Sequence, residues 1–427
     1  MQKLYTLLLN LLLPFILLRL IWRGFKQSAY RKRWRERFGY VESLCDSCLW
    51  IHAVSLGEVN AAIPLVHALK KNYPNIPIVM TTTTPTGSAQ VLNQLKDDVI
   101  HVYAPIDLPR FVRRFLNSTH PIVCILMETE IWPNILKCCS IKKIPVCIVN
   151  ARLSERSLKG YLHIRKFMSR LFWHLSFVGA QTEADAKRFM KLGLSKDKIK
   201  VLGNLKFDMT ISEEIRERVK ILREQIGERP VFVAASTHEG EEEIILSAFK
   251  KILTKQKNAL LILIPRHPER FNLVSGLISK KQFQFLKRSE MQEKNIASSD
   301  AVLLGDTMGE VLLFYACAQI AFVGGSFVSI GGHNLLEPAY FSLPILSGPN
   351  LFNFIFIRDA LEAAHALKIV NDENALAESV LNYFNDPVLS KQMGERAHQV
   401  FKNNQGTCEK YLNWLQKIIA AKPSKKF

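Results

Sequence analysis

Carboxylates stand directly after two strongly apolar segments in the first half of the 427-residue chain. Glu58 follows the segment 49–55, while Glu128 and Glu130 follow the segment 122–126. A carboxylate at a helix N-terminus has its charged form favoured, and an ionised carboxylate can serve as a general base. Either turn alone is equally typical of an ordinary helix start. The two turns together predict a carboxylate site built from two loops, with Glu58 as the base.

Two cations are placed to complete that site. Arg152 ends the next apolar segment, 146–151, and is a candidate partner for one of the carboxylates. Lys206 lies in GNLKFD, where the two halves of the chain join, and a lysine there can reach a phosphate or carboxylate across a cleft. We expect Glu130 to start the next helix.

In the second half, turns suited to anions follow four successive apolar segments: STHEGE, PRHPER, GDTMGE and GGS. Arg266 and His267 in PRHPER can grip a phosphate. The residues Met308, Gly309 and Glu310 precede a helix whose N-terminal N–H groups can hold an anion. Glycines in successive turns indicate close approach of the backbone to a ligand. Because all four turns fall on one edge of one sheet, this pattern predicts a nucleotide-phosphate site.

The elements that must position these residues alternate short β-branched segments with helical ones, which is typical of βαβ units in a parallel sheet. The rhythm pauses near residues 200–222 and then restarts, so the two halves are expected to join near residues 203–228. We therefore predict an α/β protein of two doubly wound Rossmann-like domains facing a cleft. Strands are expected at 49–55, 76–84, 101–104, 122–129, 146–151 and 177–181, and at 231–236, 260–265, 301–305, 320–324 and 343–346.

The N-terminus and the charge distribution indicate a membrane. The formal net charge is +19, and residues 19–38 carry eight basic side chains against one acidic. They follow an apolar segment whose charge-free part, 4–18, gives ~22 Å of helix against a hydrocarbon core of ~30 Å. The segment can therefore span or lie in the interface. No small-x-small site follows it, which disfavours a cleaved signal peptide.

This arrangement favours an anchor on anionic lipids, with the rest of the chain on the cytoplasmic side of the inner membrane. We expect the basic segment 31–37 to attract lipid phosphates, and we expect no nucleic acid partner. The composition, 48% hydrophobic and 22% charged, excludes a disordered chain, and a single long apolar stretch disfavours a polytopic membrane protein.

Metal catalysis is not expected. The sequence contains no Asp-x-Asp, no His-x-x-x-His and no paired CxxC. An enzyme that acts on nucleotide sugars without such ligands must stabilise its leaving phosphate with Arg, Lys and helix N-termini. The turns of the second half supply those groups.

Taken in order, these motifs resemble the 3-deoxy-D-manno-octulosonic acid (Kdo) transferases of Gram-negative lipopolysaccharide assembly. The similarity runs from the N-terminal anchor to about residue 405. It rests on YRKRWRERFG, SLGE, TTTTPTGS, METEIWPN, NARLS, GNLKFD, STHEGEE, PRHPERF, GDTMGE, FVGGS and GGHNLLEPA. Leu56 and Leu335 stand where some relatives have Val and Pro, and neither difference removes a functional group.

The resemblance implies a GT-B fold and inverting, metal-independent transfer of Kdo from CMP-Kdo to the lipid A precursor, lipid IVA. No cofactor is implied beyond this donor substrate. Glu58 would be the general base, and Glu128 with Lys206 would stabilise the transition state. The implied CMP contacts are Arg266, His267, Met308, Gly309, Glu310, Asn334, Leu335, Leu336 and Glu337.

The corresponding domains are an anchor at 1–25, an acceptor-binding domain at 26–205 and a CMP-Kdo-binding domain at 206–427. Two alternatives stay open at this point. A nucleotide-sugar epimerase or hydrolase on the same scaffold shares the nucleotide half but needs no anchor. A non-catalytic lipid- or nucleic-acid-binding protein accounts for the basic segment but not for the carboxylates. The number of Kdo units added is not encoded in any recognisable motif.

Overall fold

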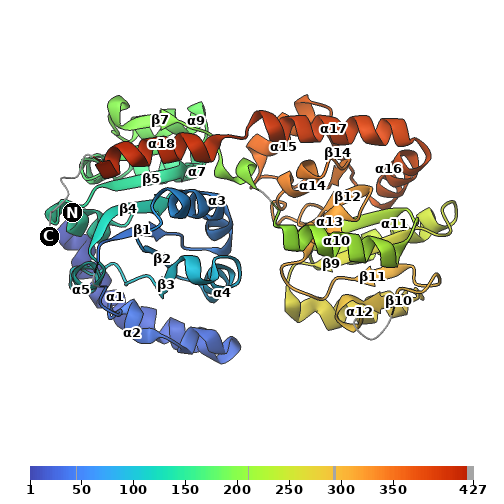
Figure 1. Ribbon diagram of the computed structural model, residues 1–427, viewed down its shortest axis with the longest axis horizontal. Helices are drawn as coiled ribbons and strands as arrows, with labels where there is room; N and C mark the ends of the chain where they lie inside the picture. Colours follow the sequence, from blue (N-terminus) through green and yellow to red (C-terminus); the bar gives the residue numbers. More distant parts are fainter. Residues whose placement is uncertain (45, 210, 292–294, 421–427) are drawn as a thin grey trace. The chain divides into compact units, whose positions relative to one another are not determined.

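The computed structural model describes residues 1–44, 46–209, 211–291 and 295–420. The chain forms two compact units, and Figure 1 labels their elements along the sequence. Unit 1 comprises Met1–Met209 together with Asn404–Phe427, and unit 2 comprises Thr210–Asn403.

Unit 1 is built on a seven-stranded sheet with the order β3-β2-β1-β4-β5-β6-β7. Every neighbouring pair in it is parallel. The strands are β1 (Cys48–His52), β2 (Ile78–Thr82), β3 (Ile100–Tyr103), β4 (Pro121–Met127), β5 (Val146–Ala151), β6 (Phe177–Ala180) and β7 (Ile199–Val201). The first six match predicted strands. The edge strand β7 was missed because it has three residues, of which two are exposed.

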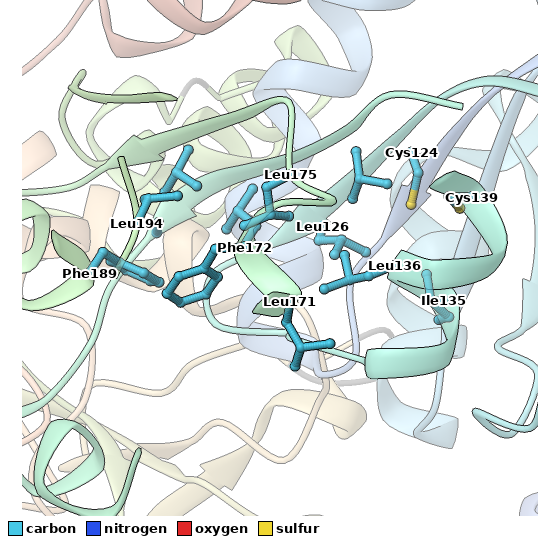
Figure 2. Packing of buried hydrophobic residues seen from close by; sticks show 14 of the residues in the cluster. Cys124, Leu126, Ile135, Leu136, Cys139, Leu171, Phe172, Leu175, Phe189 and Leu194 are labelled. Carbon is cyan, nitrogen blue, oxygen red and sulfur yellow. The ribbon is translucent and has the colours of Figure 1, made fainter. Parts of the chain in front are cut away.

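Helices cover both faces of this sheet, as its alternating side chains require. On β4, Cys124 and Leu126 enter one hydrophobic cluster, while Val123, Ile125 and Met127 enter another. Figure 2 shows part of the first cluster, where strand β4 meets side chains of the covering helices. The helices of unit 1 are α1 (Gln2–Lys26), α2 (Trp34–Arg37), α3 (Leu56–Asn72), α4 (Pro85–Gln94), α5 (Pro109–Thr119), α6 (Pro133–Ile141), α7 (Glu155–Leu162), α8 (Arg165–Phe172), α9 (Glu183–Lys191) and α18 (Thr407–Ala420), with 3-10 turns η1 (Ser28–Arg31), η2 (Lys96–Asp98), η3 (Lys196–Lys198) and η4 (Leu205–Asp208).

Unit 2 repeats the architecture with the strand order β10-β11-β9-β8-β12-β13-β14, again all parallel. Its strands are β8 (Val231–Thr237), β9 (Leu260–Pro265), β10 (Phe285–Lys287), β11 (Val302–Leu304), β12 (Ile320–Val323), β13 (Ile345–Ser347) and β14 (Leu367–Ile369). Its helices are α10 (Glu213–Ile226), α11 (Glu241–Leu253), α12 (Phe271–Lys280), α13 (Val311–Ala316), α14 (Leu336–Tyr340), α15 (Ile355–Ala363), α16 (Glu373–Asn385) and α17 (Pro387–Asn403), with 3-10 turns η5 (Pro268–Arg270) and η6 (Arg288–Glu290).

The division of the chain differs from the boundaries predicted at 205/206 and 427. Helix α18 returns to unit 1, where Trp414 stacks on Phe177 of β6 with ring centroids 4.4 Å apart. The Tyr411 hydroxyl donates to the carbonyl of Gly179 at 2.8 Å and accepts from the backbone N–H of Asn150 at 2.9 Å. No local sequence pattern predicts this return, because the partners lie more than 200 residues apart.

Helix α1 is the one described helix that is long and apolar enough to cross a membrane. The qualifying segment is Gln2–Phe25, with a mean hydropathy of 2.1 and none of its window buried. The predicted N-terminal apolar helix is therefore present. By length and composition alone, it is suited either to spanning a bilayer or to lying on one.

Candidate active site

Glu58 lies in the first turn of α3, at the carboxyl edge of the unit 1 sheet. The Ser55 hydroxyl donates to one carboxylate oxygen at 3.0 Å, and the Val54 N–H donates to the other at 2.8 Å. Ser55 also accepts from the Glu58 N–H at 3.5 Å, as in a capping box. The carboxylate is thereby fixed in place although it is buried.

The sequence predicted that the charged form of Glu58 is favoured, but in the structure the neutral form is favoured. Burial, the nearby charge of Glu130 and then that of Glu128 raise the pKa of Glu58 to about 8. The hydrogen bonds from Val54 and Ser55 favour the charged form but do not compensate. Desolvation and like charge outweigh the position at a helix N-terminus. A base with a pKa near the working pH is well matched to accept a proton.

Glu128 is the buried centre of an ion-pair group. Arg152 Nε lies 2.7 Å from Glu128 Oε2, and Lys206 Nζ lies 3.4 Å from Glu128 Oε1. The predicted partnership with Arg152 is confirmed, because β4 and β5 are parallel neighbours whose carboxyl ends meet. Glu128 has a φ of +54°, a left-handed backbone that turns its side chain at the strand end.

Lys206 belongs to unit 1, in η4, and its position depends on Asn150. The motif NARLS contains Asn150 but did not mark it as a site residue. The Asn150 side-chain oxygen accepts from the Leu205 N–H at 3.0 Å, and the Asn204 side-chain oxygen accepts from the Lys206 N–H at 3.0 Å. The end of β5 thus holds the segment whose lysine approaches Glu128.

Glu130 does not start a helix, because α6 begins at Pro133. Its carboxylate accepts from the Trp132 indole N–H at 2.6 Å within the connecting loop. Burial is the main cause that raises the pKa of Glu130, with the charge of Glu128 adding to it. Since Glu130 also raises the pKa of Glu58, the three carboxylates act on one another, as a shared site requires.

In unit 2 the four predicted turns follow β8, β9, β11 and β12. These strands stand side by side in the order β11-β9-β8-β12. The prediction that the turns share one edge of one sheet is therefore confirmed. What each turn does is only partly as predicted.

The glycine turn after β12 serves the protein's own backbone. The buried carboxylate of Glu241 accepts the N–H groups of Gly325 at 2.7 Å, Ser326 at 2.9 Å and Phe327 at 2.9 Å. A Cβ on Gly324 would lie 2.6 Å from the carbonyl oxygen of Ser236. These N–H groups hold an internal carboxylate, and the glycine permits contact with a neighbouring strand end, where the sequence suggested a ligand.

Arg266 stands among three histidines, two of which were not counted as site residues. His238 Nε2 and His333 Nε2 lie 2.8 Å apart, and their rings are stacked with an interplanar angle of 2°. His267 meets His238 edge to face, with centroids 5.3 Å apart. Burial first, then the charge of Arg266, lowers the pKa of His333 to about 3. Burial also lowers the pKa of His238, so these two imidazoles are neutral and leave the permanent charge to Arg266.

Met308 and Glu310 line a cavity of about 340 Å³ together with Arg218, Arg288, Ser289 and Thr307. Arg288 binds Glu310 with two contacts, of 3.0 and 3.2 Å, and Arg218 forms a further ion pair with it. The Glu310 carboxylate thus anchors the turn, while the exposed Met308 and the backbone around Gly309, whose φ is +81°, stay accessible.

The segment Asn334–Glu337 is held by its own hydrogen bonds. The Asn334 amide donates to Glu337 at 3.1 Å, and its oxygen accepts from the Leu336 N–H at 3.2 Å. Leu335 and Leu336 have fully buried side chains.

The basic segment 31–37 is divided in its roles. The Arg33 guanidinium donates to the carbonyl of His101 at 2.6 Å, and the buried Arg37 donates to the carbonyl of Thr83 at 3.1 Å. Both side chains bind backbone carbonyls of unit 1. The expectation that they attract lipid phosphates is therefore wrong for Arg33 and Arg37. The exposed charges of the segment are Arg31, Lys32 and Arg35.

In the described part of the chain, no group of three or more His, Cys, Asp and Glu side chains could hold a metal ion.

Comparison with known proteins supports the family resemblance seen in the motifs. Residues 32–209 match the family model described as 3-deoxy-D-manno-octulosonic-acid transferase (kdotransferase). The chain is 40% identical over 422 residues to the 3-deoxy-D-manno-octulosonic acid transferase of Haemophilus influenzae, covering 97% of this chain and 98% of that protein. It is 33% identical to that of Bordetella pertussis, covering 96% and 98%.

Among solved structures, the UDP-GlcNAc 2-epimerase of Neisseria meningitidis aligns with a TM-score of 0.60 at 16% identity, over 87% of this chain and all of that one. A glycosyltransferase of Rickettsia africae aligns with a TM-score of 0.58 at 14% identity, over 90% of this chain and all of that one. At such identities the likeness concerns the fold alone. Together with the two parallel sheets, it confirms the predicted GT-B class.

Proposed function

Because the chain belongs to the 3-deoxy-D-manno-octulosonic acid transferase family, we propose that it moves Kdo from CMP-Kdo to lipid IVA, with inversion and without a metal. Membership makes it a glycosyltransferase of lipopolysaccharide biosynthesis. Donor, acceptor, stereochemistry and metal independence are the parts that we infer. The observation that carries the proposal is the unit 1 edge, where Glu58 stands near a carboxylate bound to two cations.

We assign acceptor activation to unit 1. An inverting transfer needs a base that takes the proton of the attacking hydroxyl while the bond to the donor sugar forms. Glu58 is fixed by Ser55 and Val54, and its raised pKa suits it to receive that proton. Glu128 can stabilise positive charge that develops on the sugar, and Lys206 can face the carboxylate of Kdo.

We assign donor binding to unit 2. The bond that breaks leaves its electron pair on the CMP phosphate, so the leaving group gains negative charge. Arg266, with His267 as a further hydrogen-bond donor, can stabilise it. The backbone around Gly309 and the amide of Asn334 are the groups we assign to the nucleotide. Cations at the phosphate, with no ligand motif for a metal in the sequence, support metal-independent transfer.

To test this, the purified full chain is incubated with CMP-Kdo and lipid IVA in detergent, and the masses of the lipid products are measured by mass spectrometry. We expect a mass gain of one or more Kdo units, which also counts the sugars added, and undiminished transfer in the presence of a chelator. Release of free Kdo without any heavier lipid would instead indicate a hydrolase and would overturn the proposal.

We place the protein on the cytoplasmic side of the inner membrane. The apolar α1 and the exposed basic residues after it support this location. CMP-Kdo is a nucleotide sugar, so the side that holds it must also hold unit 2.

A further inference from the structure

Helix α1 begins with polar side chains that bind unit 1. Three side-chain hydrogen bonds join its first two turns to the loop after β3 and to the first turn of α6: Gln2 Nε2 to the Pro133 carbonyl at 2.8 Å, the Tyr5 hydroxyl to Asp107 Oδ2 at 2.9 Å, and the Thr6 hydroxyl to Asn134 Oδ1 at 3.0 Å. The start of a strongly apolar helix is therefore fixed to the globular unit.

The receiving group is part of the fold's framework. The buried Asp107 accepts the N–H groups of Asn134 at 3.0 Å and Ile135 at 2.8 Å, and so caps the start of α6. Burial raises the pKa of Asp107 to about 7. The Tyr5 hydroxyl gives this carboxylate one more donor, so docking of α1 completes a cap that unit 1 already needs.

The other end of α1 returns to the same unit. After η1, the Arg33 guanidinium donates to the carbonyl of His101, and Arg37 donates to that of Thr83. Between the two ends, the half-buried residues recur with helical spacing, at 2, 5, 6, 9, 13, 16, 17, 20 and 23. One face of α1 is thus less exposed than the opposite face along the length of the helix.

This arrangement excludes a spanning helix in the docked state. Tyr5 and Arg23 are 18 residues apart, roughly 27 Å along a helix. In a spanning orientation they would stand on opposite sides of the hydrocarbon core, yet Tyr5 binds unit 1 and the chain after Arg23 binds the same unit. We propose that α1 lies in the plane of the membrane interface, with its exposed face in the acyl region and its first turns docked on unit 1.

The occupant of the exposed face is an anionic bilayer. The large apolar side chains exposed on α1 are Leu4, Leu7, Leu8, Leu11, Leu12, Phe15, Leu18, Ile21, Trp22 and Phe25. Arg19 lies on the same helix, and Arg31, Lys32 and Arg35 follow it, all exposed. An apolar face bordered by cations is complementary to anionic lipid and not to a second, equally basic copy of this chain.

The place where α1 contacts the rest of unit 1 lies near the proposed active site. Asp107 and Pro133 follow β3 and β4, so α1 docks at the carboxyl edge that also carries Glu58 and Glu128. The membrane plane is therefore brought to the edge where the acceptor is activated. This last step rests on the proposed function, whereas the in-plane position of α1 does not.

The position is tested by topology. A tag with a protease site is added before Met1 of the full chain, and protease is applied to spheroplasts and to inverted inner-membrane vesicles. We expect cleavage only in inverted vesicles, because both ends of α1 lie on the cytoplasmic side. Cleavage in intact spheroplasts would show a spanning helix and overturn the proposal, whatever reaction the enzyme catalyses.

The docking contacts are tested with Tyr5→Phe/Thr6→Val, which keeps the apolar face and removes two hydrogen bonds. Asn10→Ala is the control, since Asn10 is exposed and bonds only to the Thr6 carbonyl in its own helix. On phosphatidylcholine vesicles containing phosphatidylglycerol, we expect the double variant to bind as the parent does. Its transfer to vesicle-borne lipid IVA should fall several-fold, with CMP-Kdo affinity unchanged.

Two results would contradict this proposal. Unchanged transfer by the double variant would show that docking has no role. A stable dimer in lipid-free solution, together with equal binding to vesicles with and without phosphatidylglycerol, would identify a second copy as the occupant.

Discussion

In unit 1 the carboxyl edge of the sheet gathers three carboxylates that act on one another, whereas in unit 2 the carboxylates at the same edge bind the backbone and arginines of their own unit. The buried Glu58 and the half-buried Glu130 lie near a third carboxylate, Glu128, and both have a raised pKa. In unit 2, Glu241 accepts backbone N–H groups and Glu242 binds Arg270 at 3.1 Å. Each carboxylate there already has its donors.

This difference separates two tasks that one architecture can perform. A proton acceptor must lack a full set of partners, because a carboxylate satisfied by cations and N–H groups has little affinity for a proton. A phosphate site needs the reverse, with cations and donors left over after internal acids are satisfied. Unit 2 also buries an acid with a raised pKa, Glu242, but there Arg270 is bound to it.

The largest effect is expected for Glu58→Gln. The amide cannot take the proton of the acceptor, so kcat should fall by about 10²–10⁴-fold. Binding of CMP-Kdo, measured by calorimetry, should stay within about twofold, since Glu58 belongs to unit 1. Glu183→Gln, at the first turn of α9 but exposed, is the matched control and should retain activity. Turnover of Glu58→Gln near the parent's would refute the base assignment.

A stability effect should follow for Glu241→Gln. In the parent, the backbone N–H groups of the glycine turn donate to both oxygens of the Glu241 carboxylate. Glutamine replaces one of these oxygens by an NH₂ group, so some of these buried N–H groups lose their acceptor. Urea unfolding should show a loss of about 2–4 kcal/mol in the free energy of unfolding. Glu243→Gln on the exposed side of α11 should change it by less than about 0.5 kcal/mol. Equal stability of the two variants would mean that Glu241 is not the internal partner of the glycine turn.

Arg266→Ala tests the cationic edge of unit 2. Loss of a charged hydrogen bond to phosphate should weaken CMP-Kdo binding by about 10–100-fold. Arg266→Lys should recover part of this, because it keeps the charge but not the planar fork. Calorimetry at pH 7 measures both, and an unchanged affinity of the alanine variant would remove Arg266 from the site.

Much of both units could be predicted because apolar segments mark buried parallel strands. The strands β7, β10 and β14 could not be predicted, since each has only three residues and lies at the edge of its sheet, with little apolar signal. The pairing of Glu128 with Arg152 could be predicted, because neighbouring parallel strands end together.

Other features depend on tertiary contacts and could not be predicted from sequence patterns. The protonation of Glu58 is decided by desolvation and by Glu130, neither of which a motif reveals. Glu241 reads as one of several acids at a helix start, and only the folded turn shows which N–H groups it accepts. Likewise, Arg37 looks like a surface cation until its contact with Thr83 is known.

The smallest effect, and the sharpest test of the carboxylate site, is a shift in the pH profile. Glu58 must be deprotonated to act as a base, and its pKa is about 8. The parent's kcat/KM should therefore rise with pH up to about 8 and then level off, with a deficit of about 100-fold at pH 6. Glu130→Gln removes the charge that, after burial, contributes most to raising this pKa. Its acidic limb should move to lower pH by up to about one unit, which increases activity at pH 6 without changing the plateau, while Glu183→Gln should leave the limb in place. A limb that stays near pH 8 in Glu130→Gln would mean that burial alone sets the protonation of Glu58, and that the carboxylates of unit 1 do not act as one group.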